Sequence, residues 1–438
     1  MFNKRLFLTK RRRRSNRFLD LIRLIQSLNP VVAYSISRRL SSSADKLMRV
    51  RLGSDNSELD IGFKNNVLDI QSLVEFGGYN LLSYTKDFFH PVWKSQSGVS
   101  ISQTNNFAPT GDNSWEIDFT NGVFIFQFID QDISSVQNVV FSAYVKGVAG
   151  ESINISITNS TNTISIPHTF NGDWQRVNIT ADFQTDLAGN TQALRSAVGK
   201  RSLPSGKFET ASWQFEIGNM PTEYQPRLQG GASDCFVTTW YDQIGSNHAT
   251  QTIATSQPKI YDVLTGDITR ENGKPAMVFD GAGDHLFIPN VAGRSNIDSY
   301  FVNRHDDTST TATNAEVYLY PTGNGAGNFG FVGRKNSTTT SLHSSSYGSP
   351  SLYKNNILLS PTNRDEVYSL IGQTQNIVNH QGASTSSWNE YQYGLYSAGE
   401  GLFHFEGTLQ EIVIFDNNLT PDNRQKLHDD INNHYNIF

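Results

Sequence analysis

Short runs of alternating apolar and polar residues, with no helical spacing between them, constrain the fold of this chain more than any other feature. Four of these runs are residues 122–129 (GVFIFQFI), 139–147 (VVFSAYVKG), 152–159 (SINISITN) and 174–180 (WQRVNIT). A period of two places alternate side chains on opposite faces of a strand. Clusters of Gly, Asn, Asp and Thr separate the runs and are typical of turns. The pattern predicts a β-sandwich or jelly roll over residues 80–228.

Composition supports an all-β, loop-rich protein. Only 17% of the 438 residues are charged, whereas 11% are aromatic. The single cysteine, Cys235, excludes an internal disulfide framework, and we expect it to be a small buried apolar residue. The histidines show no zinc-binding spacing, and the sequence contains neither a phosphate-binding glycine loop nor a nucleophile elbow. We therefore assign no catalytic residue.

The segments on either side of residues 80–228 contain strands with a different sequence pattern. Residues 31–79 contain LMRVRL and LDIGF around a GSDNS turn, and residues 229–438 contain VTTWYDQ, KPAMVFDG and GTLQEIVIFD. The Trp240–Tyr241 pair is expected to place one ring in the core and the other on the opposite face. These segments predict a sandwich that resumes after the interruption.

The last 20 residues predict the one clear helix of the body. Thr420 is its expected cap and Pro421 its first residue. Leu427, Ile431 and Tyr435 recur at helical spacing and should form its buried stripe.

The N-terminus is a basic arm on an acidic body. Residues 1–30 hold nine Lys or Arg and one Asp, a net charge of +8, whereas the remainder carries −14. Residues 15–29 predict a short amphipathic helix, too short to be stable alone. The basic run and apolar stripe comprise Arg11, Arg12, Arg13, Arg14, Phe18, Leu21, Ile22 and Ile25.

Several partners would suit this arm. Its stripe could dock on the body, on sister chains or on a larger assembly, and the alternatives are a disordered tail or a membrane-surface helix. Its charge could meet nucleic acid or an acidic particle surface. No apolar run approaches the roughly 18 residues that span a bilayer, so we expect no membrane insertion. We expect no secretion signal either, because Asp20 and Arg23 interrupt the apolar stretch.

Two stretches carry a family resemblance. Residues 33–63 and 236–286 resemble the β-sandwich of the α-L-arabinofuranosidase B catalytic domain, and more closely its non-enzymatic relatives in bacteriophage tail-fibre and virion surface proteins. Residues 80–228 are similar to the carbohydrate-binding-module-like jelly rolls of phage tail proteins. Residues 407–438 look like the closing strand and helix of laminin-G/concanavalin-like domains.

The resemblance and the patterns together predict an all-β chain. Residues 31–79 and 229–438 should form one concanavalin/laminin-G-like sandwich, interrupted by a jelly roll over residues 80–228. A basic anchoring helix in residues 1–30 and a short C-terminal helix complete the predicted fold.

Four carboxylates are the candidates for a glycosidase of the arabinofuranosidase type, which would need two of them close together. They are Asp242, Asp280, Asp284 and Glu316. Asp242 is better explained as an acceptor for the turn that follows it. Asp280 and Asp284 fit a tight turn, and calcium is the one cofactor they could hold. The family's active site also uses a cysteine pair, which this chain lacks, so we expect no enzyme activity.

Aromatic side chains are the candidates for sugar binding, because sugars stack on exposed rings. Trp93, Trp174, Trp213 and Tyr224 are the candidates in residues 80–228, with Trp174 and Trp213 better explained as core. Trp388 lies in a polar loop and is expected to be exposed.

The leading functional hypothesis is a bacteriophage virion protein, either a tail fibre or a capsid-attached fibre or decoration protein. It would be made in the host cytoplasm, join other virion proteins through residues 1–30, and present its sandwiches to host-surface polysaccharide. The resemblance implies a homo-oligomer, often a trimer. The alternatives are an arabinofuranosidase-type hydrolase and a purely structural particle protein.

Overall fold

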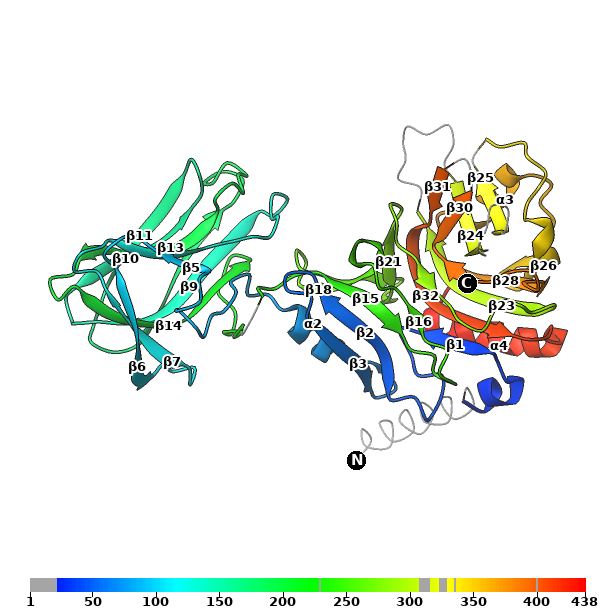
Figure 1. Cartoon of the computed structure of the whole chain (residues 1–438), viewed down its shortest axis with the longest axis horizontal. Coiled ribbons are helices and arrows are strands. Elements are labelled where there is room, and N and C mark those ends of the chain that lie inside the picture. Colours follow the sequence, from blue (N-terminus) through cyan, green and yellow to red (C-terminus); the bar gives the residue numbers. More distant parts are fainter. Residues whose placement is uncertain (1–21, 228–229, 307–315, 323–328, 335, 399–400) are drawn as a thin grey trace, which may run out of the picture.

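The computed structural model describes residues 22–227, 230–306, 316–322, 329–334, 336–398 and 401–438. Within them strands dominate and helices are short, which confirms the all-β prediction. Figure 1 shows two bodies: the strands of residues 93–217 gather in one, and the strands before and after them in the other. No helix among the described residues is long and apolar enough to cross a bilayer.

The strands of residues 93–217 form a sandwich of two antiparallel five-stranded sheets. Their orders are β11-β10-β13-β8-β5 and β12-β9-β14-β7-β6. The strands are β5 (Trp93–Ser95), β6 (Ser100–Phe107), β7 (Asn113–Asp118), β8 (Phe124–Phe128), β9 (Asn138–Lys146), β10 (Ser152–Thr158), β11 (Thr163–Thr169), β12 (Gln175–Asp182), β13 (Arg195–Ser202) and β14 (Lys207–Ile217).

The core of this sandwich follows from the alternation in the sequence. Ile153, Ile155 and Ile157 on β10 are fully buried, whereas Asn154 and Ser156 between them are only half-buried. Alternate residues of a strand point to opposite faces, so the three isoleucines face the other sheet. Burying three isoleucine side chains contributes roughly 5–9 kcal/mol of apolar transfer free energy, an upper estimate.

The second body is built from the strands on both sides of this sandwich. They are β1 (Val32–Ser35), β2 (Lys46–Leu52), β3 (Glu58–Lys64), β4 (Val67–Leu68), β15 (Cys235–Trp240), β16 (Ala249–Thr250), β17 (Lys259–Asp262), β18 (Asp267–Ile268), β19 (Arg270–Glu271), β20 (Lys274–Pro275), β21 (Met277–Asp280), β22 (Leu286–Phe287), β23 (Ile297–His305), β24 (Glu316–Thr322), β25 (Phe329–Arg334), β26 (Gly348–Lys354), β27 (Ile357–Leu359), β28 (Asn376–Ala383), β29 (Gln392–Tyr393), β30 (Leu395–Ala398), β31 (Gly401–His404) and β32 (Glu406–Phe415). β32 pairs with β1, β21 and β23, and β15 pairs with β2. Sequence-distant segments are thus joined in one sheet.

Short helices cover this body. They are α2 (Ile70–Gly77), α3 (Arg364–Ile371), α4 (Pro421–Tyr435) and an unlabelled helix over residues 22–28. The Thr420 hydroxyl accepts from the backbone N–H of Asn423, and Pro421 begins α4. Leu427, Ile431 and Tyr435 are fully buried, so the sequence prediction for this helix is confirmed.

The two bodies are joined where the chain enters and leaves the residue 93–217 sandwich. The backbone N–H of Ala232 donates to the Asn80 carbonyl at 2.7 Å, and the N–H of Leu81 donates to the Phe215 carbonyl at 2.8 Å. The Asn80 amide also donates to the Trp213 and Gln225 carbonyls. The two crossings are therefore hydrogen-bonded to each other, which holds the ends of the interruption together.

The stretch around Trp240 and Asp242 ties β15 to the rest of the second body. Trp240 is fully buried, and Tyr241 is half-buried with its hydroxyl donating to an Asp60 carboxylate oxygen at 2.7 Å. The Asp242 carboxylate accepts from the backbone N–H groups of Ala33, Ile244 and Asn247. The predicted turn role of Asp242 is confirmed, with an additional bond to β1 that sequence reasoning did not anticipate.

Candidate functional site

The predicted anchoring stripe is covered by the chain's own body. Ile22 is 5% exposed and Ile25 is fully buried. Ile25 packs in one apolar cluster with Leu427 and Ile431 of α4. The expectation that Ile22 and Ile25 face another virion protein is therefore wrong. Arg11, Arg12, Arg13, Arg14, Phe18 and Leu21 lie outside the described residues.

Two of the predicted sugar-binding aromatics are core residues. Trp93 is 6% exposed, stacks on Phe88 with ring centroids 4.2 Å apart, and donates its indole N–H to the Tyr84 carbonyl. Trp388 is 3% exposed and stacks on Tyr347. The expectation of an exposed Trp388 is wrong, because Tyr347 stacks on its ring and Ser346 accepts its indole N–H.

The other three aromatics differ in accessibility. Trp213 is fully buried, which agrees with the core explanation. Trp174 is half-buried and lies immediately before β12, and Tyr224 is half-buried with its hydroxyl 2.8 Å from that of Thr85. Burial raises the pKa of the Tyr224 hydroxyl. Trp174 and Tyr224 remain predictions for contact with a ligand.

The calcium candidates use their carboxylates within a turn. An Asp280 carboxylate oxygen accepts from the N–H of Ala282 at 2.7 Å, and one of Asp284 accepts from the N–H of Asp280 at 3.0 Å. Burial, followed by the charge of Asp280, raises the pKa of Asp284 to about 7. Across the part of the chain that the structure describes, no three His, Cys, Asp or Glu side chains are grouped to hold a metal ion.

The other carboxylate candidates belong to different elements. Asp242 accepts hydrogen bonds from the turn that follows it, Asp280 ends β21, Asp284 lies shortly after it, and Glu316 begins β24. Cys235 is fully buried, and burial raises the pKa of its thiol, so it behaves as a small apolar residue.

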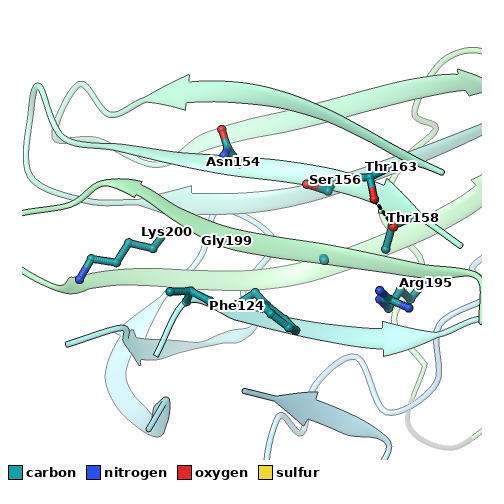
Figure 2. Close-up of a pocket in the computed structure, with 10 residues that line it drawn as sticks. Phe124, Asn154, Ser156, Thr158, Thr163, Arg195, Gly199 and Lys200 are labelled. Atoms are coloured by element: carbon teal, nitrogen blue, oxygen red, sulfur yellow. Dashed lines mark hydrogen bonds between the residues drawn. The ribbon is translucent and has the colours of Figure 1, made fainter. Parts of the chain in front are cut away.

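An open hollow of about 290 Å³ lies on the outer face of the β11-β10-β13-β8-β5 sheet. We call it the β13 hollow. It is lined by Val123, Phe124, Asn154, Ser156, Thr158, Thr163, Arg195, Ala197, Gly199 and Lys200. Figure 2 shows Arg195 and Lys200 at opposite ends, Phe124 on one side, and Asn154 and Ser156 on the other. Five steps along β13 separate the two cations, about 17 Å in an extended strand.

The central strand creates the hollow because its outward side chains are small. Ala197 and Gly199 form the floor, between taller side chains on the neighbouring strands. A methyl group placed on Gly199 would approach the Val123 carbonyl oxygen at 3.4 Å and the Phe124 Cβ at 3.8 Å, which is ordinary van der Waals contact. The backbone there thus tolerates a side chain, and the missing side chain leaves space above the sheet.

One wall of the hollow belongs to an aromatic stripe on β8. Phe124 and Phe126 are half-buried and Phe128 is 38% exposed, whereas Ile125 and Gln127 between them are buried. The β8–β13 register pairs Phe124 with Gly199, Phe126 with Ala197 and Phe128 with Arg195. Residues directly opposite in an antiparallel pair share a face. The three rings therefore line up beside the floor, with centroids 5.7 and 5.2 Å apart.

The opposite wall is made of short polar side chains. The β10–β13 register places Asn154 beside Gly199, Ser156 beside Ala197 and Thr158 beside Arg195. Ser156 donates to the Ser165 hydroxyl at 3.0 Å, and Thr158 and Thr163 are paired through their hydroxyls. Amide and hydroxyl groups of this kind donate and accept hydrogen bonds.

Sequence reasoning recognised the β8 strand and missed its outer face. Phe124, Phe126 and Phe128 follow each other at intervals of two, which by itself places three rings on one side. Their exposed side could not be assigned from the sequence, because phenylalanines at alternate positions usually face a core. The decisive information is that Ile125 and Ile155 occupy the inner face.

No protein family model matches this sequence, and no curated protein matches it. Solved structures align with about a third of the chain. One is the CBM22-2 xylan-binding domain of Xyn10C from Paenibacillus barcinonensis, which is 12% identical, with 31% of this chain and 98% of that chain covered and a TM-score of 0.25. Another is the family 11 carbohydrate-binding module from Clostridium thermocellum in complex with a β-1,3-1,4-mixed-linked tetrasaccharide, which is 18% identical, with 33% and 98% covered and a TM-score of 0.24.

A third similar structure is the enzymatically active domain of tailspike protein 4 from bacteriophage CBA120. It is 11% identical, with 32% of this chain and 22% of that chain covered and a TM-score of 0.25. Likenesses at these TM-scores assign no function, so the functional inference rests on the residues of the β13 hollow.

Proposed function

We propose that this protein binds glycan, and that the β13 hollow is the binding site. The observation that carries the proposal is the pairing of a phenylalanine wall with a polar wall across a floor of Ala197 and Gly199. A sugar ring has one apolar face that packs on an aromatic ring, and hydroxyls around its edge that hydrogen-bond to amides and hydroxyls. The hollow is open, so a polysaccharide chain can lie across the sheet.

The wider proposal is a bacteriophage virion protein that presents this site to polysaccharide of the host surface. Its support is the resemblance of residues 33–63, 80–228 and 236–286 to phage tail proteins and the basic charge of residues 1–30. Since Ile22 and Ile25 are used within the body, residues 1–21 are the proposed attachment arm. We propose that the chain acts by binding and not by hydrolysis.

Glycan binding is tested by changing the floor and the aromatic wall separately. Gly199→Val should fill the floor and reduce affinity for a bound oligosaccharide at least tenfold. Phe124→Ala should weaken binding about tenfold, equivalent to ~1.4 kcal/mol, because the stacking surface is lost. Isothermal titration calorimetry with hits from a glycan array measures both.

The opposite sheet offers matched controls. Phe107 is 64% exposed on the edge strand β6, and Asn178 is exposed on β12. Phe107→Ala and Asn178→Val should leave affinity unchanged. If Gly199→Val binds every array hit as tightly as the natural protein, the β13 hollow is not the site.

The attachment proposal is tested by deleting residues 1–21. The truncated chain keeps the helix over residues 22–28 and should fold, yet it should be missing from purified particles. Its incorporation at the normal copy number would refute the role of the arm.

A further inference from the structure

The sheet that carries the β13 hollow contains no acidic residue in any of its strands. β5, β8, β10, β11 and β13 hold no Asp or Glu, whereas Lys94, Arg195, Lys200 and Arg201 supply four cations. This composition contrasts with a body that carries a net charge of −14 after residue 30. The hollow is thus a basic surface on an acidic protein.

The other sheet of the same sandwich has the opposite character. Its strands carry five carboxylates, at Glu116, Asp118, Asp182, Glu209 and Glu216. Lys207 on that sheet is neutralised, with its ammonium 2.8 Å from a Glu116 carboxylate oxygen and 3.7 Å from one of Asp118. The acidic residues of the sandwich strands therefore lie on the sheet opposite the hollow.

The cations of the hollow sheet are held by neutral groups. A guanidinium nitrogen of Arg195 donates to the Ala193 carbonyl at 3.2 Å, and the Lys200 ammonium donates to the Phe119 carbonyl at 3.1 Å. An Arg201 guanidinium nitrogen lies 3.5 Å from the Asn154 amide oxygen. Among the described residues, none of the four cations of this sheet forms an ion pair. They are Lys94, Arg195, Lys200 and Arg201.

Their positions follow the aromatic stripe. The Arg195 guanidinium lies over the rings of Phe126 and Phe128, 5.4 and 5.9 Å from their centroids. Lys94 is directly opposite Phe126 in the β5–β8 pair, so it shares the face. Lys200 lines the far end of the hollow. A ligand that packs on the phenylalanines meets Arg195 at one end and Lys94 at the side, and Lys200 borders the other end of the hollow.

We propose that the glycan recognised by the β13 hollow is an anionic polysaccharide that carries carboxylate or sulfate groups on its sugars. This inference rests on the proposed function. Positive groups without acidic partners attract an anion and bind it with little competition from the protein's own carboxylates. Arg195 would take the acidic group through its planar fork while the sugar ring packs on Phe124. The acidic remainder of the body would confine such a ligand to this sheet.

Single-stranded nucleic acid also combines negative charge with rings that stack. The hollow suits it less well, because Phe124 and Phe126 are half-buried and Arg195 covers Phe126 and Phe128. Flat bases need open ring faces, whereas a puckered sugar needs a short apolar contact and hydroxyl partners such as Ser156 and Thr158. We therefore favour the polysaccharide.

The experiment uses a matched pair of probes that differ only in charge. The full-length protein is titrated with an oligogalacturonate and with the same oligosaccharide fully methyl-esterified, and with dextran sulfate and dextran as a second pair. We expect each anionic probe to bind at least tenfold tighter than its neutral partner. This preference should shrink several-fold between 50 and 500 mM NaCl, because salt screens the exposed charges.

Variants of the cations locate the effect. Arg195→Gln should weaken the oligogalacturonate at least fivefold more than it weakens the esterified probe, and Arg195→Lys should recover part of that difference. Lys207→Gln removes a cation from the opposite sheet and should change nothing.

The outcomes separate this inference from the proposed function. Equal, salt-independent binding of charged and esterified probes would overturn the anionic preference and leave glycan binding intact. Binding of none of these probes or of any glycan on an array would overturn both. An oligo(dT) that binds as tightly as oligogalacturonate, or a Lys207→Gln variant as weak as Arg195→Gln, would also overturn the inference.

Discussion

Replacing Ile25 by Ala tests whether the helix over residues 22–28 belongs to the second body. Ile25 is fully buried beside Leu427 and Ile431, so the change removes three buried carbon atoms and leaves a cavity. Truncations of this kind cost about 2–5 kcal/mol, and the better helix propensity of Ala returns only a few tenths. We expect a loss of about 3 kcal/mol in the free energy of unfolding of the second body, which corresponds to roughly 5–10 °C in Tm.

Hydrogen exchange measured by mass spectrometry resolves this loss by segment. Peptides from α4 and β32 should exchange faster in Ile25→Ala, and peptides from β9 and β14 in the other sandwich should be unchanged. Gln26→Ala, at an exposed position of the same helix, is the control. If α4 peptides exchange at the same rate in Ile25→Ala and Gln26→Ala, the helix over residues 22–28 does not dock on the body. An external partner for its apolar stripe must then be reconsidered.

Three further perturbations probe the second body. Asp242→Ala should cost about 2 kcal/mol in chemical denaturation, because three backbone N–H groups lose their acceptor, and Asp242→Asn should cost less; equal losses would contradict this account. Arg38→Met should lower the free energy of unfolding by about 3–5 kcal/mol, because Glu411, 2.7 Å from the Arg38 guanidinium, is left buried without its partner. Adding Glu411→Leu should recover most of this loss, and a double variant as unstable as the single one would argue against the account. Burial lowers the pKa of His428 to about 4 and of His380 to about 3, so their stabilisation is complete above about pH 6.5 and is lost as the pH falls through 4 and 3. Urea unfolding should show about 2 kcal/mol less stability per histidine at pH 5 than at pH 7, and about 2 kcal/mol of the total loss should be absent in His428→Gln; a pH-independent midpoint would contradict it.

Local patterns predicted the elements whose determinants lie close together in the chain. The cap and stripe of α4 are contained within residues 420–435, so Thr420, Leu427 and Tyr435 could be assigned before their surroundings were known. The strand alternation of Ile153, Ile155 and Ile157 is equally local. Asp242 was interpreted correctly because most of its hydrogen bonds are made to the turn that follows it.

Exposure of aromatic residues could not be predicted in the same way. Trp388 lies in a polar stretch, yet Tyr347 stacks on its ring and Ser346 accepts its indole N–H at 3.0 Å. Phe124 lies in an apolar strand, yet it faces outward beside Gly199. The polarity of the adjacent sequence was therefore misleading in both cases. The residue that decides the exposure of each ring lies far away in the chain, about 40 positions for Trp388 and about 75 for Phe124.

The sequence by itself determined the all-β class, the strands and the C-terminal helix, since these follow from side-chain periodicity and turn chemistry within a few residues. It also determined the charge of each strand, including the absence of acidic residues from β5, β8, β10, β11 and β13. Only the tertiary structure decided that these five strands share one sheet, that Ala197 and Gly199 form a floor there, and that the stripe containing Ile25 is satisfied within the chain. The physical reason is that neighbours across a sheet are chosen by packing between distant segments, which no local pattern specifies.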